Sequence, residues 1–427
     1  MKIFLNNKLS SYKKHQVWIP AFAGMTYLFF ILFLFNPNNV LASPSNDPVL
    51  ELQKRLDEIV AAADCNVSVQ IVSASKYDML YSYNPESRMI PASITKLVTS
   101  AIALEFLGSN YKFKTIVYTD GTVTDGNIEG NIYLKGFGDP DLNSSDIATL
   151  AQRLSEKGIK SVSGNLYYDE SFLDNNYYGL SNYFKGDTRS NYWPYVSAIN
   201  LDKNQGGYNP ASTAADLLAS EIVRLGIVFN GNITSGVTPP AAKELAEVSH
   251  EIFDVLSYMN KESDNHSAIT VFKVVGAVHG GIPGSLEKGT QAVVELLTSM
   301  GQDRGSFEIL EGSGLTRQNM VTSDMYMRLL KYMYDDVKNF DFFYQTLAIG
   351  GYDGTLRKRM IGGEAERNVH AKTGTLNGVS TLTGYAISRD NELIIFYIAM
   401  NGFSGSNTYY KDIQDAICEA ICQFTRK

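Results

Sequence analysis

Residues 91–108, PASITKLVTSAIALEFLG, hold the feature that most constrains how this chain can fold. Their apolar side chains recur so closely that they fall on every face of a helix, and Gly108 is a typical C-terminal stop. A helix that is apolar all round has to be buried in a core. Lys96 lies near the start of this helix, so the sequence predicts a lysine that is carried out of water.

Composition allows such a core and excludes some partners. The chain has 427 residues, 44% hydrophobic and 19% charged, which suffices for two or three folded domains. Its net charge of −8 argues against nucleic acid as a partner, because phosphate binding needs a basic face. The five histidines and three cysteines form no ligand-spaced cluster, so we expect no metal and no other cofactor.

The N-terminus has the pattern of a targeting segment. Four lysines and no acidic residue precede the apolar run YLFFILFLF at 27–35, and Val40-Leu41-Ala42 follows with small residues. The apolar run is shorter than the ~20 residues that span a membrane comfortably. We therefore expect residues 1–42 to be a signal peptide and the rest to be periplasmic. The alternative is a retained N-terminal anchor, which would give peripheral membrane association.

The texture of the chain changes twice and predicts an α+β fold with an insertion. Residues 43–113 and 243–427 combine helical patterns with two strand patterns near the start and three near the end. These strands could share one antiparallel sheet, which would make the domain discontinuous in sequence. Residues 114–242 are rich in short strands, turns, tyrosine and glycine, with two amphipathic helices, and are expected to form an inserted α+β domain.

Three short motifs carry residues suited to acyl transfer: Ser93-x-x-Lys96, Ser263-Asp264-Asn265 and Lys372-Thr373-Gly374. Each alone has an ordinary structural interpretation, as a helix start, a helix cap and the end of a strand. The Ser-x-x-Lys spacing also occurs at five other places in the chain. Their order, and the element in which each lies, favour a common site.

The first two motifs supply a nucleophile and its proton transfers. A serine hydroxyl needs an adjacent base to become nucleophilic, and a lysine can be that base when burial lowers its pKa. Ser93 and Lys96 are three residues apart on a helix and so share a face. Ser263 and Asn265, on a loop, would connect to the lysine and relay the proton to the leaving group.

The third motif supplies binding groups on a strand. Lys372 would offer positive charge to a substrate carboxylate, and Thr373 would hydrogen-bond to it. Gly374 lacks a Cβ and would let the substrate lie against the strand. The backbone N–H groups of Ser93 and Thr375 would form an oxyanion hole.

With these motifs the chain resembles a known family, the penicillin-binding protein 4-like serine D-alanyl-D-alanine carboxypeptidases/endopeptidases (class C low-molecular-mass penicillin-binding proteins, peptidase family S13). The segments that carry the resemblance are PASITKLVTSAIALEFLG, GFGDPDL (136–142), GIKSVSGNLYYDESFL (158–173), NKESDN (260–265), EGSGLTRQN (311–319) and HAKTGTLNGVSTLTGYA (370–386).

The resemblance implies a β-lactamase/transpeptidase-like domain with a five-stranded antiparallel sheet and an all-helical part that carries Ser93 and Ser263. It also implies cleavage of D-Ala-D-Ala bonds, or of D-Ala–diaminopimelate cross-links, in peptidoglycan peptides through an acyl-enzyme on Ser93. β-Lactams would be covalent inhibitors at the same serine. Lys96, Asn265 and the residues of the third motif would take the roles given above.

Two departures and two alternatives accompany this interpretation. Better-known members carry two nested insertions, whereas this chain has room for one, with LDKNQGGYNP (201–210) at the place of the second. Members that grip diaminopimelate place an acid just after Trp-Pro, whereas Tyr195 follows Trp193-Pro194 here. The alternatives are a serine β-lactamase and a catalytically idle cell-wall-binding protein. No glutamate between 266 and 371 lies in a Glu-x-x-x-Asn setting that we favour for deacylation, and an idle binder needs no buried lysine beside a serine.

Overall fold

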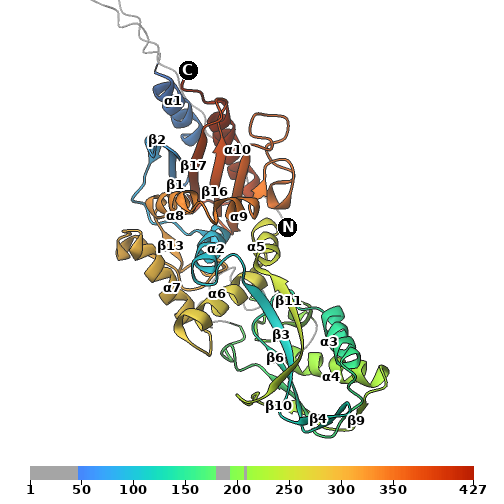
Figure 1. Ribbon diagram of the computed structural model, residues 1–427. Coiled ribbons are helices and arrows are strands. Elements are labelled where there is room, and N and C mark those ends of the chain that lie inside the picture. The colour runs from blue at the N-terminus through green and yellow to red at the C-terminus, as the bar shows by residue number, and fades with distance from the viewer. Residues whose placement is uncertain (1–46, 179–192, 206–208) are drawn as a thin grey trace, which may run out of the picture. The chain divides into compact units, whose positions relative to one another are not determined.

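The computed structural model describes residues 47–178, 193–205 and 209–427 (Figure 1). The predicted signal peptide, residues 1–42, lies outside this described part. The described residues belong to one unit, 46–427. No helix within them is long and apolar enough to cross a membrane.

The two ends of the described chain share one antiparallel sheet, as the sequence predicts. Its order is β14-β15-β16-β17-β1-β2, and the strands are β1 (Asn66–Ser73), β2 (Met79–Tyr83), β14 (Ala348–Ile349), β15 (Val369–Leu376), β16 (Val379–Ile387) and β17 (Leu393–Asn401). β1 pairs with β17 from Asn66↔Asn401 to Ser73↔Ile394. The sheet therefore has the five expected long strands, and the two-residue β14 adds a sixth at its edge.

Both faces of this sheet are covered. On β17, Ile394, Phe396 and Ile398 face a core formed with α1 (Pro48–Val60) and α10 (Asn407–Gln423). The alternate residues Ile395 and Tyr397 face a second core, formed with helices from the middle of the chain. Burial on both faces explains why the sequence of β17 is a continuous apolar run and does not alternate.

An all-helical part adjoins the sheet (Figure 1). It contains a 3₁₀ turn η1 (Ala92–Ile94), followed by α2 (Thr95–Phe106), α5 (Ile252–Lys261), α6 (Asn265–Gly280), α7 (Leu286–Ser299), α8 (Ser323–Asp335) and α9 (Phe340–Gln345). Every residue of α2 from Thr95 to Leu104 is buried, which confirms the burial predicted from its all-round apolar sequence. Short elements accompany this part: β12 (Phe307–Glu308), β13 (Met320–Val321) and η5 (Arg304–Ser306). η6 (Gly354–Leu356) instead contributes Leu356 to the core between the sheet and α1 and α10.

The middle of the chain builds a second, mixed sheet of order β10-β8-β6-β3-β11. Its strands are β3 (Lys112–Thr119), β6 (Ile132–Gly136), β8 (Leu166–Asp169), β10 (Ile233–Ser235) and β11 (Lys243–Glu251). α3 (Ser144–Glu156) and α4 (Pro210–Arg224) pack against it, and β4 (Thr122–Thr124), β5 (Asn127–Glu129), β7 (Ser161–Val162) and β9 (Val228–Phe229) form a small third sheet.

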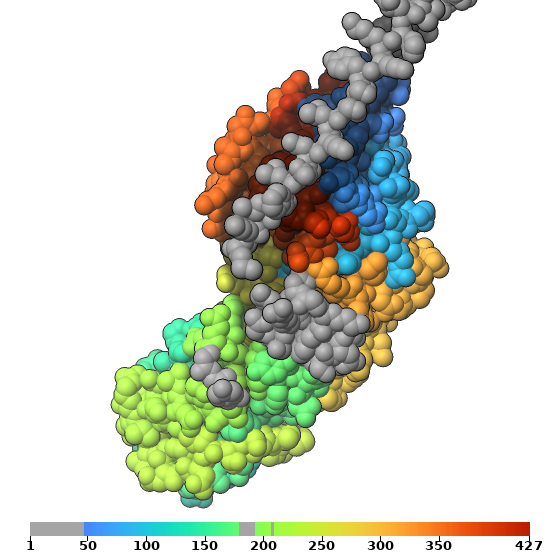
Figure 2. All heavy atoms as spheres, turned by 180° about the vertical axis from the view of Figure 1, so that it is seen from behind, coloured from blue at the N-terminus to red at the C-terminus, as the bar shows by residue number. Residues whose placement is uncertain are grey.

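The second sheet extends beyond the boundaries set from sequence texture. β11 pairs with β3 along its length, although it starts at residue 243, where we expected the insertion to have ended. Figure 2 shows the green residues of this middle segment gathered together, while the blue and red ends of the chain lie side by side. A 3₁₀ element, η4 (Leu201–Asn204), lies in the same segment and returns the chain toward the all-helical part.

Candidate active site

Ser93 lies in the tight turn that starts the buried helix. Ala92 has a left-handed backbone with φ of 50°, and Thr95 Oγ1 donates a hydrogen bond of 2.8 Å to the Ala92 carbonyl. Gly314 packs so closely that a Cβ there would lie 1.9 Å from the same carbonyl oxygen. These contacts hold the turn, and Ser93 remains partly exposed while Lys96 is fully buried.

The Lys96 ammonium joins three segments that are distant in sequence. Nζ donates to Ser93 Oγ at 3.1 Å, to Asn265 Oδ1 at 2.8 Å and to the Ser313 carbonyl at 2.7 Å. An ammonium has three donors, so all of them are used. Burial lowers the pKa of Lys96 to about 8, against an opposing effect of the Glu311 and Asp264 carboxylates. At a pKa of about 8, Lys96 can lose a proton at mildly alkaline pH, and the neutral amine could then accept a proton from Ser93.

Lys372 forms a second, neighbouring cluster with Ser263. Its Nζ donates to Ser263 Oγ and to the Thr373 carbonyl, both at 2.9 Å. Burial, together with the charge on Lys96, holds the pKa of Lys372 well below its usual range. An anionic group bound beside Lys372 would favour its charged form. The structure thus brings Ser93, Lys96 and Asn265 together directly, and Ser263 and Lys372 beside them.

The remaining residues of the third motif lie on β15. Thr373 Oγ1 donates to Thr355 Oγ1 at 2.9 Å, and Thr375 is exposed toward the end of the strand. A Cβ on Gly374 would lie 2.2 Å from Thr381 Oγ1 and 3.0 Å from the backbone nitrogen of Ser93. Atoms of the protein itself therefore require glycine at position 374. We had expected a bound substrate to impose this requirement.

A loop at 311–319, to which we assigned no catalytic role from the sequence, completes the lysine site. The fully buried Glu311 carboxylate accepts hydrogen bonds from the Ser313 N–H at 2.6 Å and the Gly314 N–H at 2.8 Å. Asn319 Nδ2 also donates to it, at 3.3 Å. These bonds aim the Ser313 carbonyl at Lys96. The sequence did hold one indication of this role: Glu311 directly precedes Gly-Ser-Gly, and no exposed helix or strand is predicted there that would explain an acidic residue.

Replacing Glu311 by glutamine is expected to loosen this loop. The amide N–H₂ would face backbone N–H donors, and buried donors left unpaired cost about 1–3 kcal/mol. Denaturant unfolding should show a loss of this size, together with slower acylation of Ser93. The control is Glu308→Gln, at a half-exposed residue paired with Arg304 at 3.7 Å, where a change within about 0.5 kcal/mol is expected. Equal stability of the two variants would contradict the role given to Glu311.

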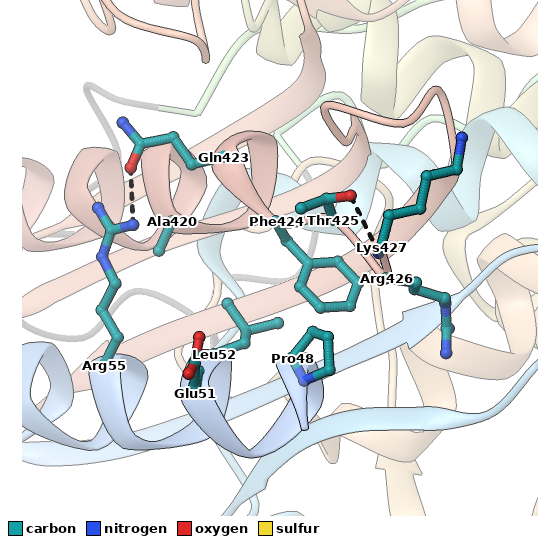
Figure 3. Close-up of a pocket in the computed structure, with 10 residues that line it drawn as sticks. All are labelled: Pro48, Glu51, Leu52, Arg55, Ala420, Gln423, Phe424, Thr425, Arg426 and Lys427. Carbon is teal, nitrogen blue, oxygen red and sulfur yellow. Dashed lines mark hydrogen bonds between the residues drawn. The ribbon is translucent and has the colours of Figure 1, made fainter. Parts of the chain in front are cut away.

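Two pockets differ in their relation to this site. One of about 420 Å³ is lined by Ser263 and Asn265 together with residues of the middle segment, among them Tyr195, Lys203 and Asn204. The other, of about 590 Å³, lies between α1 and the C-terminal residues, where Arg55 donates to Gln423 (Figure 3). The second pocket shares no residue with the three motifs, whereas the first is lined by all three residues of the second motif.

An α+β domain in which a serine hydroxyl accepts a hydrogen bond from a buried lysine is typical of serine acyl-transfer enzymes. Within this class, the chain belongs to the D-Ala-D-Ala carboxypeptidase 3 (S13) family, whose model matches residues 52–208 and 207–423. The resemblance inferred from the motifs is thereby confirmed.

Characterised relatives and solved structures agree with this assignment. The chain is 27% identical to the D-alanyl-D-alanine carboxypeptidase DacB of Haemophilus influenzae, over 87% of this chain and 92% of that protein. It is also 27% identical to a D-alanyl-D-alanine carboxypeptidase of Actinomadura sp., over 92% of this chain and 88% of that protein. The crystal structure of penicillin-binding protein 4 from Haemophilus influenzae covers 85% of this chain and 97% of its own, with a TM-score of 0.74 and 24% identity. The predicted α+β fold class is confirmed.

Proposed function

We propose that this protein is a serine D-Ala-D-Ala carboxypeptidase that acts on peptidoglycan stem peptides through an acyl-enzyme on Ser93, and that it also acts as a D,D-endopeptidase on peptidoglycan cross-links. The observation that carries the proposal is the fully buried Lys96 ammonium, shared between Ser93 Oγ, Asn265 Oδ1 and the Ser313 carbonyl. A merely structural lysine would not be desolvated against a partly exposed serine.

The proposed reaction begins with proton transfer. Lys96, as the neutral amine, takes the proton of Ser93 as Oγ attacks the carbonyl carbon of the penultimate D-alanine. The N–H groups of Ser93 and Thr375 stabilise the oxyanion that develops on the carbonyl oxygen. The C–N bond then breaks, and the departing amine takes up a proton. Water hydrolyses the remaining ester and frees Ser93.

Ser263 and Lys372 take part at the leaving-group side. Ser263 accepts a hydrogen bond from Lys372 and lies two residues before Asn265, which contacts Lys96, so it can pass a proton to the departing amine. Lys372 and Thr373 bind the terminal carboxylate, whose charge favours the ammonium form of the buried lysine. In a β-lactam the departing nitrogen stays attached to the acyl group, so we expect the covalent adduct on Ser93 to be long-lived.

The setting of the enzyme is part of the same proposal. The lysine-led apolar run and the small residues before position 43 support a signal peptide at 1–42 and a periplasmic location. The separate core around α3, α4 and the second sheet supports an inserted domain near 114–242, to which β3 and β11 also contribute. The proposed partner is the peptidoglycan stem peptide, and the net charge of −8 argues against nucleic acid.

Intact-mass spectrometry with benzylpenicillin tests the nucleophile. The wild type should gain the mass of one penicillin, and Ser93→Ala should gain none while keeping its thermal transition. Ser109→Ala is the matched control, because Ser109 has the same spacing to Lys112, whose ammonium is surface-exposed and paired with Glu251 at 2.6 Å. An unlabelled wild type would contradict the proposal, and rapid loss of the adduct with antibiotic turnover would indicate a β-lactamase.

A further inference from the structure

The middle segment reaches the second motif through one turn, at 202–204. Asp202, Lys203 and Asn204 all have left-handed backbones, with φ of 48°, 54° and 57°. This conformation is disfavoured for residues other than glycine and persists only where the surroundings enforce it. Three consecutive residues in this conformation indicate that contacts of their side chains hold the turn in place.

Within the turn, Lys203 is the residue whose side chain contacts the second motif. Its Nζ donates to Asp141 Oδ1 at 2.7 Å and to Ser267 Oγ at 3.0 Å, and lies 3.5 Å from Asp264 Oδ1. The Tyr258 ring lies beneath it, 4.6 Å from Nζ to the centroid. One ammonium thus bridges an acid of the middle segment and the acid at the centre of Ser263-Asp264-Asn265.

Asp264 in turn holds the start of α6. Its Oδ1 accepts hydrogen bonds from the Ser267 N–H at 2.8 Å and the Ser267 hydroxyl at 2.6 Å, which makes it the N-cap of the helix that begins at Asn265. Burial alone would raise the pKa of the Asp264 carboxyl, but Lys203 and the bonds from Ser267 outweigh burial and lower it. Asp264 is therefore a carboxylate, matched to the lysine above it.

The next residue of the turn, Asn204, contacts His266, which directly follows Asn265 in the sequence. Asn204 Nδ2 donates to the Tyr195 carbonyl at 2.8 Å and to Asn200 Oδ1 at 2.9 Å, and lies 3.4 Å from His266 Nε2. Consecutive residues of one strained turn thus contact Asp264 and His266, which flank Asn265. Asn265 in turn accepts a hydrogen bond from Lys96 at 2.8 Å.

We propose that Lys203 is a positioning residue: through Asp264 it sets the orientation of Asn265 and Ser263 toward Lys96 and Lys372. The middle segment would then be a structural part of the active site in addition to a neighbour of its pocket. This inference rests on the proposed acyl-enzyme function. Lys203 touches neither the reacting serine nor the base among the contacts described, so it would act on the acylation step through Asp264.

Saturation kinetics with a fluorescent penicillin test the proposal. Lys203→Met, which removes the charge but keeps an unbranched chain, is expected to slow the acylation step roughly tenfold, within the range of energetic coupling between contacting residues. Because Lys203 also lines the neighbouring pocket, the dissociation constant of the preceding non-covalent complex can change, but by a smaller factor than the acylation rate constant. Lys203→Arg should recover most of the rate, because it restores the charge next to Asp264 and Asp141.

A double-mutant cycle and a control complete the test. In an Asp264→Asn background, Lys203→Met should have less than about a twofold further effect, because the two residues act together. The control is Lys135→Met, which breaks the 3.1 Å pair with buried Asp169 inside the second sheet and should leave acylation unchanged. If Lys203→Met fails to fold, Lys203→Gln is expected to show the same loss.

Acylation of Lys203→Met at the wild-type rate, or losses that multiply in the cycle, would overturn the positioning role. A wild type that is not acylated at all would instead overturn the proposed function. The two failures are therefore distinguishable in one experiment.

Discussion

Replacement of Lys96 by alanine is expected to slow acylation of Ser93 by about 10³-fold or more while the protein stays folded. The reason is that Ser93 has no other base within hydrogen-bond distance among its described contacts, and a serine hydroxyl is a weak nucleophile. The measurement is the second-order rate constant for labelling by a fluorescent penicillin, with circular dichroism to confirm the fold. Alanine removes a buried charge but also leaves Asn265 Oδ1 and the Ser313 carbonyl without the Lys96 donor, so a loss of about 1–3 kcal/mol in the free energy of unfolding is expected.

Lys96→Arg is the sharper companion variant. Arginine keeps the positive charge and the hydrogen-bond donors, but its guanidinium does not release a proton in the accessible pH range. If Lys96 served only to orient Asn265 and the Ser313 carbonyl, the arginine variant would retain substantial activity. We expect it to be as inactive as the alanine variant. Labelling of Lys96→Arg at the wild-type rate would rule out Lys96 as the base.

The pH dependence of the wild type follows from the same residue. Lys96 accepts a proton only when it is neutral, and burial lowers its pKa to about 8. The acylation rate constant should therefore rise with pH through about 8 and level off above it. Stopped-flow labelling between pH 6 and pH 10 would measure this profile. A flat profile across that window would contradict a titrating lysine base.

Replacement of Lys372 by alanine is expected to weaken cleavage of peptides that end in free D-Ala-D-Ala. A charge-assisted hydrogen bond to the terminal carboxylate contributes about 1.5–3 kcal/mol, which corresponds to roughly 10- to 150-fold in kcat/KM. The same peptides with a C-terminal carboxamide lack the charge, so for them the variant and the wild type should differ much less. Chromatographic measurement of released D-alanine or D-alaninamide gives both numbers.

The comparison between the two substrates separates binding from structural damage. If the alanine variant merely distorted β15, both peptides would be cleaved more slowly by the same factor. If it cleaved the free-carboxylate peptide at the wild-type rate, Lys372 would not be the carboxylate-binding residue. A suitable control is Lys261→Ala, because Lys261 pairs with Asp353 at 2.6 Å and lies two residues before Ser263 without contacting it.

Much of the fold could be predicted because its signals are local. The all-round apolar stretch at 91–108 predicted a buried helix, and the apolar runs near both ends predicted one shared sheet. β11 was missed, because no strand was predicted at 243–251 and the insertion was expected to end at 242. The two-residue strand β14 was missed because two residues have no periodicity.

The residues of the candidate site could be predicted from the sequence, but the contacts between them could not. The three motifs were recognisable because each has its own polarity and its own place in a helix, loop or strand. Their contacts were not: Lys96 meets Asn265 across 169 positions, and Lys372 meets Ser263 across 109. The carbonyl of Ser313 could not be assigned either, because its orientation comes from the hydrogen bonds of Glu311. Lys203 lay in a stretch taken for the trace of a missing insertion.

The amino-acid sequence by itself determined the α+β class, the burial of Lys96 and the candidates for the reactive groups, because apolar periodicity and residue chemistry act over a few neighbouring positions. Only the tertiary structure decided which oxygens accept the three hydrogen bonds of Lys96, which neighbouring atoms require glycine at position 374, and how a strained turn at 202–204 reaches Asp264. Those properties depend on distances between segments that only the packed core brings together, and on the desolvation that this packing imposes on both lysines.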